Sequence, residues 1–234
     1  MKELSENPGK VRVGLVIFVV LLAALIGRFV YRYADKATRI TDEAKEFMGR
    51  DKYDSALAKL DEALAEDPEH LPAHYHRGIC LAEKHRFEEA IAAFDRVTEL
   101  DSTEADAYFN KGKILHYLER HEEAAGVLEQ AVEHQRNLEG PNRKSVWLLM
   151  GDCLYEAFLH KLANSPDENP SPARAIAAYN TYLRENPESH NTSKVEKKLE
   201  ILKNPEDFKE VIEKRKPGKR KTVRLQDLVD KEGS

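Results

Sequence analysis

Small and apolar residues recur at a spacing of 34 residues through the middle of the chain. One set lies at Ala56, Ala90 and Ala124, at Leu60, Phe94 and Leu128, and at Ala63, Val97 and Ala131. A second, upstream set lies at Ala44, Gly78 and Gly112, and at Phe47, Leu81 and Leu115. A fixed period of this length indicates stacked units that bury their apolar faces against one another. Because the positions within each unit fall at helical spacing, the pattern predicts an all-α solenoid of stacked helical units.

The period predicts three regular units and a fourth that carries an insertion near residues 155–174. A charged segment with apolar residues at helical spacing follows, and it is expected to cap the last unit. The predicted segments are an N-terminal tail (1–10), a transmembrane helix (11–33), the array (37–188, as 37–70, 71–104, 105–138 and 144–188), a capping helix (189–203), and a short helix with a basic tail (205–234).

The N-terminal segment is strongly apolar and has no charge from Val13 to Gly27. A straight helix of that length spans about 22 Å, and flanking Arg12 and Arg28 can extend it toward the roughly 30 Å hydrocarbon core of a membrane. A cleaved signal peptide is the alternative, but no small-residue cleavage site follows. The sequence therefore predicts a single-pass membrane protein with an N-terminal anchor. The excess of basic residues after the span favours a cytoplasmic C-terminal body.

The repeating unit resembles the tetratricopeptide repeat, in a protein anchored to a membrane at its N-terminus. The resemblance rests on the small and apolar residues of the first helix, on the Ala, aromatic or Leu, and Ala of the second, and on the closing Pro68. The fourth unit matches through Trp147, Gly151 and Leu154, and the third departs at His121, where the first two have an aromatic residue. The resemblance implies a pair of antiparallel helices in each unit and a protein that binds other proteins.

By this resemblance, the first helices of the units line a concave groove that binds an extended or helical polypeptide. Packing between repeats is the alternative role for the aromatic residues among them. The predicted groove residues are Tyr75, His76, Ile79, Phe109, Asn110, Lys113, Tyr117, Leu148, Asp152 and Tyr155.

One use of this family is a carboxylate clamp that grips the C-terminal tail of chaperones. Of the clamp positions only Asn110 matches, because Tyr75, Phe109, Ser145 and Leu149 stand where the family has Lys or Arg. We therefore expect no chaperone-tail clamp.

Charge and motifs narrow the function further. Residues 35–204 carry 23 Lys and Arg against 33 Asp and Glu, a net charge of −10, which disfavours nucleic acid as the ligand of the repeats. Cys80 and Cys153 are predicted to be reduced. His76 and Cys80 share a helical face, but two ligands do not complete a zinc site. No phosphate-binding or hydrolase motif is present, so we expect no enzyme, cofactor, metal or small-molecule substrate.

The C-terminal tail is strongly basic and is a candidate contact for anionic lipid or RNA, with a solubilising tail as the alternative. The sequence thus predicts a membrane-anchored scaffold that binds a protein or peptide in the groove. The alternatives are a structural subunit of a larger membrane or envelope assembly, and a ribosome-, RNA- or lipid-tethering factor that acts through the tail. The tail residues are Lys214, Arg215, Lys216, Lys219, Arg220, Lys221 and Arg224.

Overall fold

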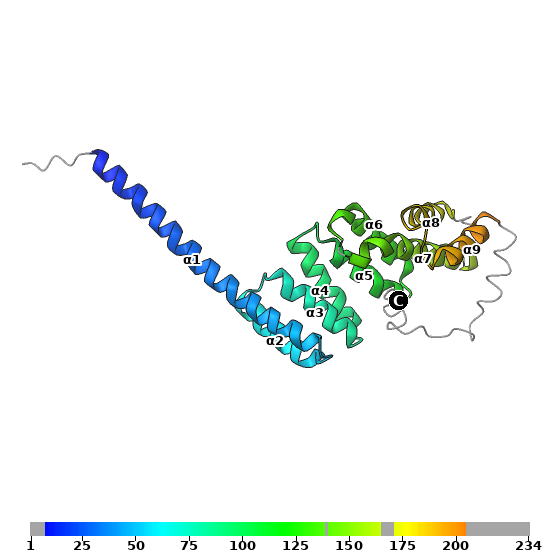
Figure 1. Ribbon diagram of the computed structural model, residues 1–234, viewed down its shortest axis with the longest axis horizontal. Helices are drawn as coiled ribbons and strands as arrows, with labels where there is room; N and C mark the ends of the chain where they lie inside the picture. Colours follow the sequence, from blue (N-terminus) through cyan, green and yellow to red (C-terminus); the bar gives the residue numbers. More distant parts are fainter. Residues whose placement is uncertain (1–7, 139, 165–170, 205–234) are drawn as a thin grey trace, which may run out of the picture. The chain divides into compact units, whose positions relative to one another are not determined.

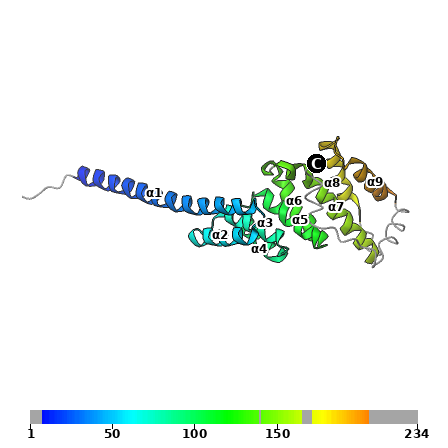
Figure 2. The same ribbon diagram turned by 60° about the horizontal axis from the view of Figure 1, so that its bottom comes forward.

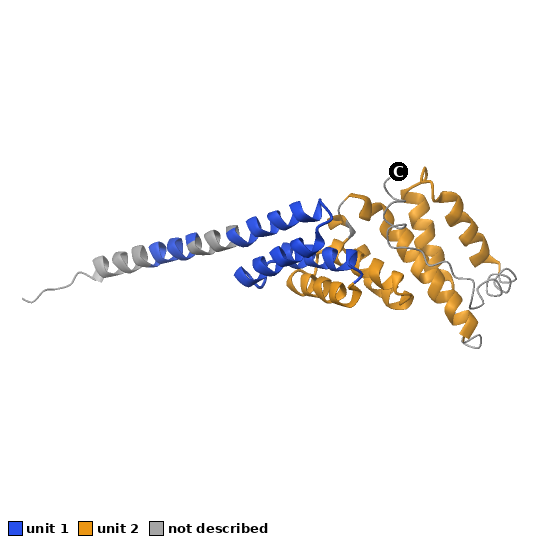
Figure 3. Cartoon of the chain, turned by 90° about the horizontal axis from the view of Figure 1, so that it is seen from below, with its two compact units in different colours: residues 1–85 blue, residues 86–234 orange. Residues whose placement is uncertain are grey.

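The computed structural model describes residues 8–138, 140–164 and 171–204, and every regular element in these ranges is helical (Figure 1). Within each of the two units described below, successive helices pack against one another, which confirms the predicted all-α, repeat-like architecture. The chain divides into two compact units, Met1–His85 and Arg86–Ser234, coloured blue and orange in Figure 3. The basic tail and the predicted short helix at 205–234 lie outside the described residues.

The first unit contains α1 (Pro8–Met48), α2 (Tyr53–Glu66) and α3 (Leu71–Glu83). Helix α2 packs against both α1 and α3. Ion pairs at the edge of this packing join Lys59 Nζ to Glu43 Oε2 at 3.1 Å and Arg77 Nε to Asp61 Oδ1 at 3.0 Å. The core is formed by the repeat positions of all three helices, among them Ala44, Ala56, Leu60, Ala63, Ala73 and Leu81.

The second unit contains α4 (Phe87–Leu100), α5 (Ala105–Tyr117), α6 (His121–Glu133), the 3₁₀ turn η1 (Gln135–Asn137), α7 (Gly140–Asn164), α8 (Ala173–Glu185) and α9 (Thr192–Lys203). Neighbouring helices pack in chain order, α4 on α5, α5 on α6, α6 on α7, α7 on α8 and α8 on α9 (Figure 2). Because α7 also touches α5, the first helices of consecutive pairs lie side by side.

Glycine permits close approach within two of these helix pairs. A Cβ atom on Gly112 of α5 would lie 2.6 Å from Leu128 of α6, and one on Gly151 of α7 would lie 2.6 Å from the ring of Tyr179 on α8. Both distances are far inside ordinary van der Waals contact. The small residue that recurs in the first helix therefore sets the spacing to the second helix.

The turn between the two helices of a pair is closed by a residue in the left-handed conformation. These residues are Asp51, His85 and Glu119, with φ of 56°, 58° and 60°. They are 34 residues apart, so each of the three regular repeats uses the same turn. None of them is glycine, although this backbone conformation is strained for residues that carry a Cβ atom.

The structure contradicts the predicted transmembrane helix at 11–33 and the single-pass membrane localisation derived from it. Within the described part of the chain, no helix combines the length and the apolar character needed to cross a membrane. The predicted segment lies within α1. Helix α1 then continues into the packed unit, where Ala37 and Ile40 are buried. The predicted cytoplasmic location of the C-terminal body was derived from that anchor and therefore loses its basis.

Candidate functional site

In the first unit, Tyr75, His76 and Ile79 all lie on α3 and are half-buried. The Tyr75 and His76 rings meet edge to face, with centroids 5.5 Å apart. Burial lowers the pKa of His76 to about 4, and its buried Nδ1 has no hydrogen-bond partner among the described atoms. His76 is therefore neutral at pH 7 and gives this helix face no charge.

On α5 of the second unit, Asn110, Lys113 and Tyr117 are half-buried and follow one another at helical spacing. Asn110 Nδ2 donates to the carbonyl oxygen of residue 106 at 2.8 Å. Lys113 Nζ lies 5.7 Å from the centroid of the Phe109 ring, and Phe109 itself is only 1% exposed. Phe109 thus packs inside the helix array, whereas its three neighbours keep accessible surface.

On α7, Asp152 and Tyr155 make contacts that fasten α9. Asp152 Oδ1 accepts hydrogen bonds from Tyr179 OH and from Lys198 Nζ, both at 2.6 Å. The same ammonium group lies 5.1 Å from the centroid of the Tyr155 ring, which is 3% exposed. Buried beside Asp152, the Tyr179 hydroxyl has a pKa raised well above its ordinary value, first by desolvation and then by the carboxylate. Little of the Tyr155 surface is therefore accessible to a ligand.

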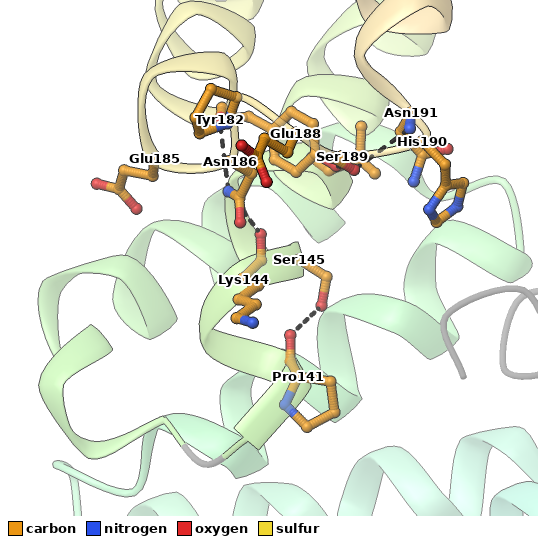
Figure 4. A pocket seen from close by; sticks show the side chains of 12 residues that line it. Pro141, Lys144, Ser145, Tyr182, Glu185, Asn186, Glu188, Ser189, His190 and Asn191 are labelled. Carbon is orange, nitrogen blue, oxygen red and sulfur yellow. Dashed lines mark hydrogen bonds between the residues drawn. The ribbon is translucent and has the colours of Figure 1, made fainter. Parts of the chain in front are cut away.

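The half-buried Leu148, one turn before Asp152, borders a hollow of about 430 Å³ (Figure 4). Its wall mixes apolar side chains with amides, hydroxyls and both signs of charge. The lining residues come from the first half of α7, the end of α8 and the segment that leads to α9: Pro141, Lys144, Ser145, Leu148, Tyr182, Glu185, Asn186, Pro187, Glu188, Ser189, His190 and Asn191.

Hydrogen bonds fix the wall of this hollow. Asn186 Nδ2 donates to the carbonyl oxygens of Tyr182 at 3.1 Å and of Lys144 at 3.3 Å, and so joins the end of α8 to α7. The hydroxyls of Tyr182 and Ser189 are 2.5 Å apart, and the Ser189 oxygen also accepts from the backbone N–H of Asn191 at 3.3 Å. The hollow is therefore preformed.

Of the ten predicted groove residues, only Leu148 lines this hollow. The structure brings Asn110, Lys113 and Tyr117 together on α5 and places Leu148 and Asp152 on α7, and a binding role for any of the ten stays a prediction. The sequence signal that was missed is the segment 186–191, where Pro, Asn and Ser lie between two helices. In the described ranges, no group of three or more His, Cys, Asp or Glu is arranged to hold a metal.

Comparison with known proteins identifies a repeat family and a fold. A family model described as tetratricopeptide repeat matches residues 41–105, 84–137 and 109–190. MamA from Desulfovibrio magneticus RS-1, solved from residue 41 to its end, has 20% identity and a TM-score of 0.57, over 80% of this chain and 98% of that one. The pilF protein of Pseudomonas aeruginosa has 20% identity and a TM-score of 0.55, over 86% and 78%.

A third solved structure is the first repeat domain of Spaghetti (RPAP3) bound to an HSP90 peptide. It has 19% identity and a TM-score of 0.47, over 52% of this chain and 94% of that one. At these identities the likeness concerns the fold alone. Comparison with curated protein sequences finds no match.

Proposed function

Because the chain belongs to the tetratricopeptide repeat family, we propose that it binds a polypeptide partner in the hollow beside Leu148. Proteins of this family are scaffolds for protein–protein interaction, and their repeats are generally not catalytic. The role proposed for this chain is likewise that of a scaffold, which holds a partner without reacting with it.

The observation that carries the proposal is the hollow itself. Its volume of about 430 Å³ lies in the range of sites that enclose a small ligand or one large side chain with its flanking backbone. Leu148 and Pro141 offer apolar contact to such a side chain. Asn191 carries an amide that can both donate and accept, and Asn186, whose Nδ2 is bonded to two backbone carbonyls, has its Oδ1 as an acceptor. These groups suit the alternating N–H and C=O groups of a peptide backbone.

We include the accessible face of α5 in the proposed surface. Asn110, Lys113 and Tyr117 remain accessible on that helix, and α5 touches α7. A segment that leaves the hollow along this face would meet an amide, an ammonium group and a phenol. Partners of this kind are bound by a few anchors in pockets, while the surrounding polar contacts define the register.

The proposal is tested by selecting binders from a random peptide library displayed on phage, with the full chain as bait. Fluorescence polarisation then compares the selected peptides on the parent chain and on Leu148→Arg, which places a long cation in the hollow. Ala177→Arg on the exposed face of α8 is the matched control. We expect affinity to fall at least tenfold, about 1.4 kcal/mol, for Leu148→Arg and to be unchanged for the control. Equal binding by the two variants would place the partner elsewhere and refute the site.

A further inference from the structure

Two imidazoles and a thiol from three different helices meet inside the second unit. His116 is near the end of α5, His121 is the first residue of α6, and Cys153 lies in the middle of α7. His116 Nδ1 is 3.2 Å from His121 Nδ1 and 3.4 Å from Cys153 Sγ. The two rings have centroids 5.1 Å apart. Cys153 is fully buried, and both histidines are half-buried.

The distance between the two Nδ1 atoms restricts how many protons the pair can hold. A nitrogen–nitrogen separation of 3.2 Å is a hydrogen bond only if one Nδ1 carries a proton and the other offers its lone pair. When both imidazoles are charged, both Nδ1 atoms carry protons, and two N–H groups point at each other. The Cys153 thiol then also loses the lone pair on His116. The observed packing is therefore compatible with one charged imidazole at most.

Both rings are neutral in this environment at pH 7. Burial is the main cause of the lowered pKa of His116. The charges of Lys198 and Lys194 on α9 also lower this pKa, whereas Asp152 and Glu156 on α7 raise it. Burial also lowers the pKa of His121. The other charged groups that face His121 are His116 and His160, which lower its pKa further, and Glu156 and Glu119, which raise it. A second hollow, separate from the one beside Leu148, adjoins His121, and its other charged lining residues include Arg120, Glu122, Glu123 and Lys161.

The pair is peculiar to this repeat. At the 34-residue spacing, His116 corresponds to Ala82 and His121 to Phe87. In the preceding repeat the same two positions hold Met48 and Tyr53. Neither earlier repeat has an imidazole at either position.

We propose that the cluster of His116, His121 and Cys153 makes the packing of α5, α6 and α7 sensitive to mild acid. The unfolded chain takes up protons on these imidazoles near pH 6.5, whereas the folded unit takes them up only at lower pH. Above about pH 6.5 the cluster contributes its full packing stability. As pH falls below that value, the unfolded state binds more protons than the folded state, and stability is lost.

The test is urea unfolding of the full chain between pH 7.5 and 5.0, followed by the fluorescence of Trp147. This residue is the single tryptophan of the sequence and lies on α7. Each imidazole that is charged only in the unfolded chain raises the unfolding constant by up to about tenfold per pH unit. We expect His116→Met with His121→Phe, which restores residue types of the earlier repeats, to remove a rise of up to about fivefold per imidazole in the unfolding constant between pH 6.5 and 5.5.

His190→Gln is the matched control: it removes an exposed imidazole of the same unit, and the acid sensitivity that we assign to the cluster should persist in it. Equal pH slopes for the parent chain and the double variant overturn the proposal. If the double variant does not fold, His121→Phe alone is compared with the parent. Nuclear magnetic resonance of the two rings in the parent gives a second reading. Titration of both rings at pH 6.5 or above overturns the proposal, and titration of both rings below that value supports it.

Discussion

Substitution of Gly151 by alanine tests whether the close approach of α7 and α8 limits the stability of the second unit. The new Cβ atom would lie 2.6 Å from Cδ1 and 2.7 Å from Cε1 of Tyr179, where ordinary contact begins near 3.4 Å. Tyr179 has no exposed surface, and its hydroxyl is held by Asp152 at 2.6 Å. The ring therefore cannot move aside without losing that hydrogen bond.

The expected cost follows from two opposing effects. Overpacking of a well-filled core costs about 1–3 kcal/mol, and replacing glycine by alanine inside a helix returns roughly 0.5–1 kcal/mol. We expect Gly151→Ala to lower the free energy of unfolding by about 1–2 kcal/mol, and to lower the melting temperature by roughly 2–4 °C per kcal/mol. Urea unfolding read by Trp147 fluorescence measures the change.

Gly126 supplies the matched control. It lies inside α6, is exposed, and would place its Cβ atom with nothing within 4 Å. Gly126→Ala should therefore stabilise the unit by roughly 0.5–1 kcal/mol through the helix alone. If Gly151→Ala stabilised the chain in the same way, the claim that α7 and α8 are spaced by this glycine would be refuted.

Three further predictions follow from individual side chains. Lys198→Met leaves the partly buried carboxylate of Asp152 without its cation. Hydrogen exchange of the α9 amides should then accelerate by the equivalent of about 1–3 kcal/mol. Unchanged exchange would contradict the role of Lys198 in holding α9 against α7. Burial raises the pKa of Cys80 to about 11 and also raises the pKa of Cys153. Both free thiols should therefore resist alkylation by iodoacetamide at pH 8 in the folded chain and react in urea, as measured by intact mass. Rapid alkylation of the folded chain would contradict their burial. His76 should titrate near pH 4 by nuclear magnetic resonance, and because the unfolded ring titrates near 6.5, its unit loses stability as pH falls from that value toward 4; titration at 6.5 contradicts this.

The helix pairs could be predicted from the sequence because their signal is local and repeated. Ala90, Phe94 and Val97 fall at helical spacing, and all three are buried, as are their counterparts one repeat before and after. Period and burial agree because each unit packs on its neighbours in the same way.

The site contacts could not be predicted in the same way because they join positions far apart in the chain. Asp152 meets Tyr179, 27 residues away, and Lys198, 46 residues away. The spacing of each helix is visible in the sequence, but which face meets a later helix depends on how the helices cross. His121 was recognisable as a departure from the repeat, whereas its partner His116 lies across a turn and was not.

The left-handed residues at 51, 85 and 119 show that the backbone geometry of this turn is fixed independently of the side chain that occupies it. The three positions hold an aspartate, a histidine and a glutamate, yet their φ angles differ by only a few degrees. Repeats that share one turn geometry can exchange their connecting segments while keeping the same helix pairing. The turn therefore has the same backbone conformation in each repeat, whichever of these residues occupies it. Replacing the three residues by glycine would relieve the strain of the left-handed conformation and could stabilise an engineered array.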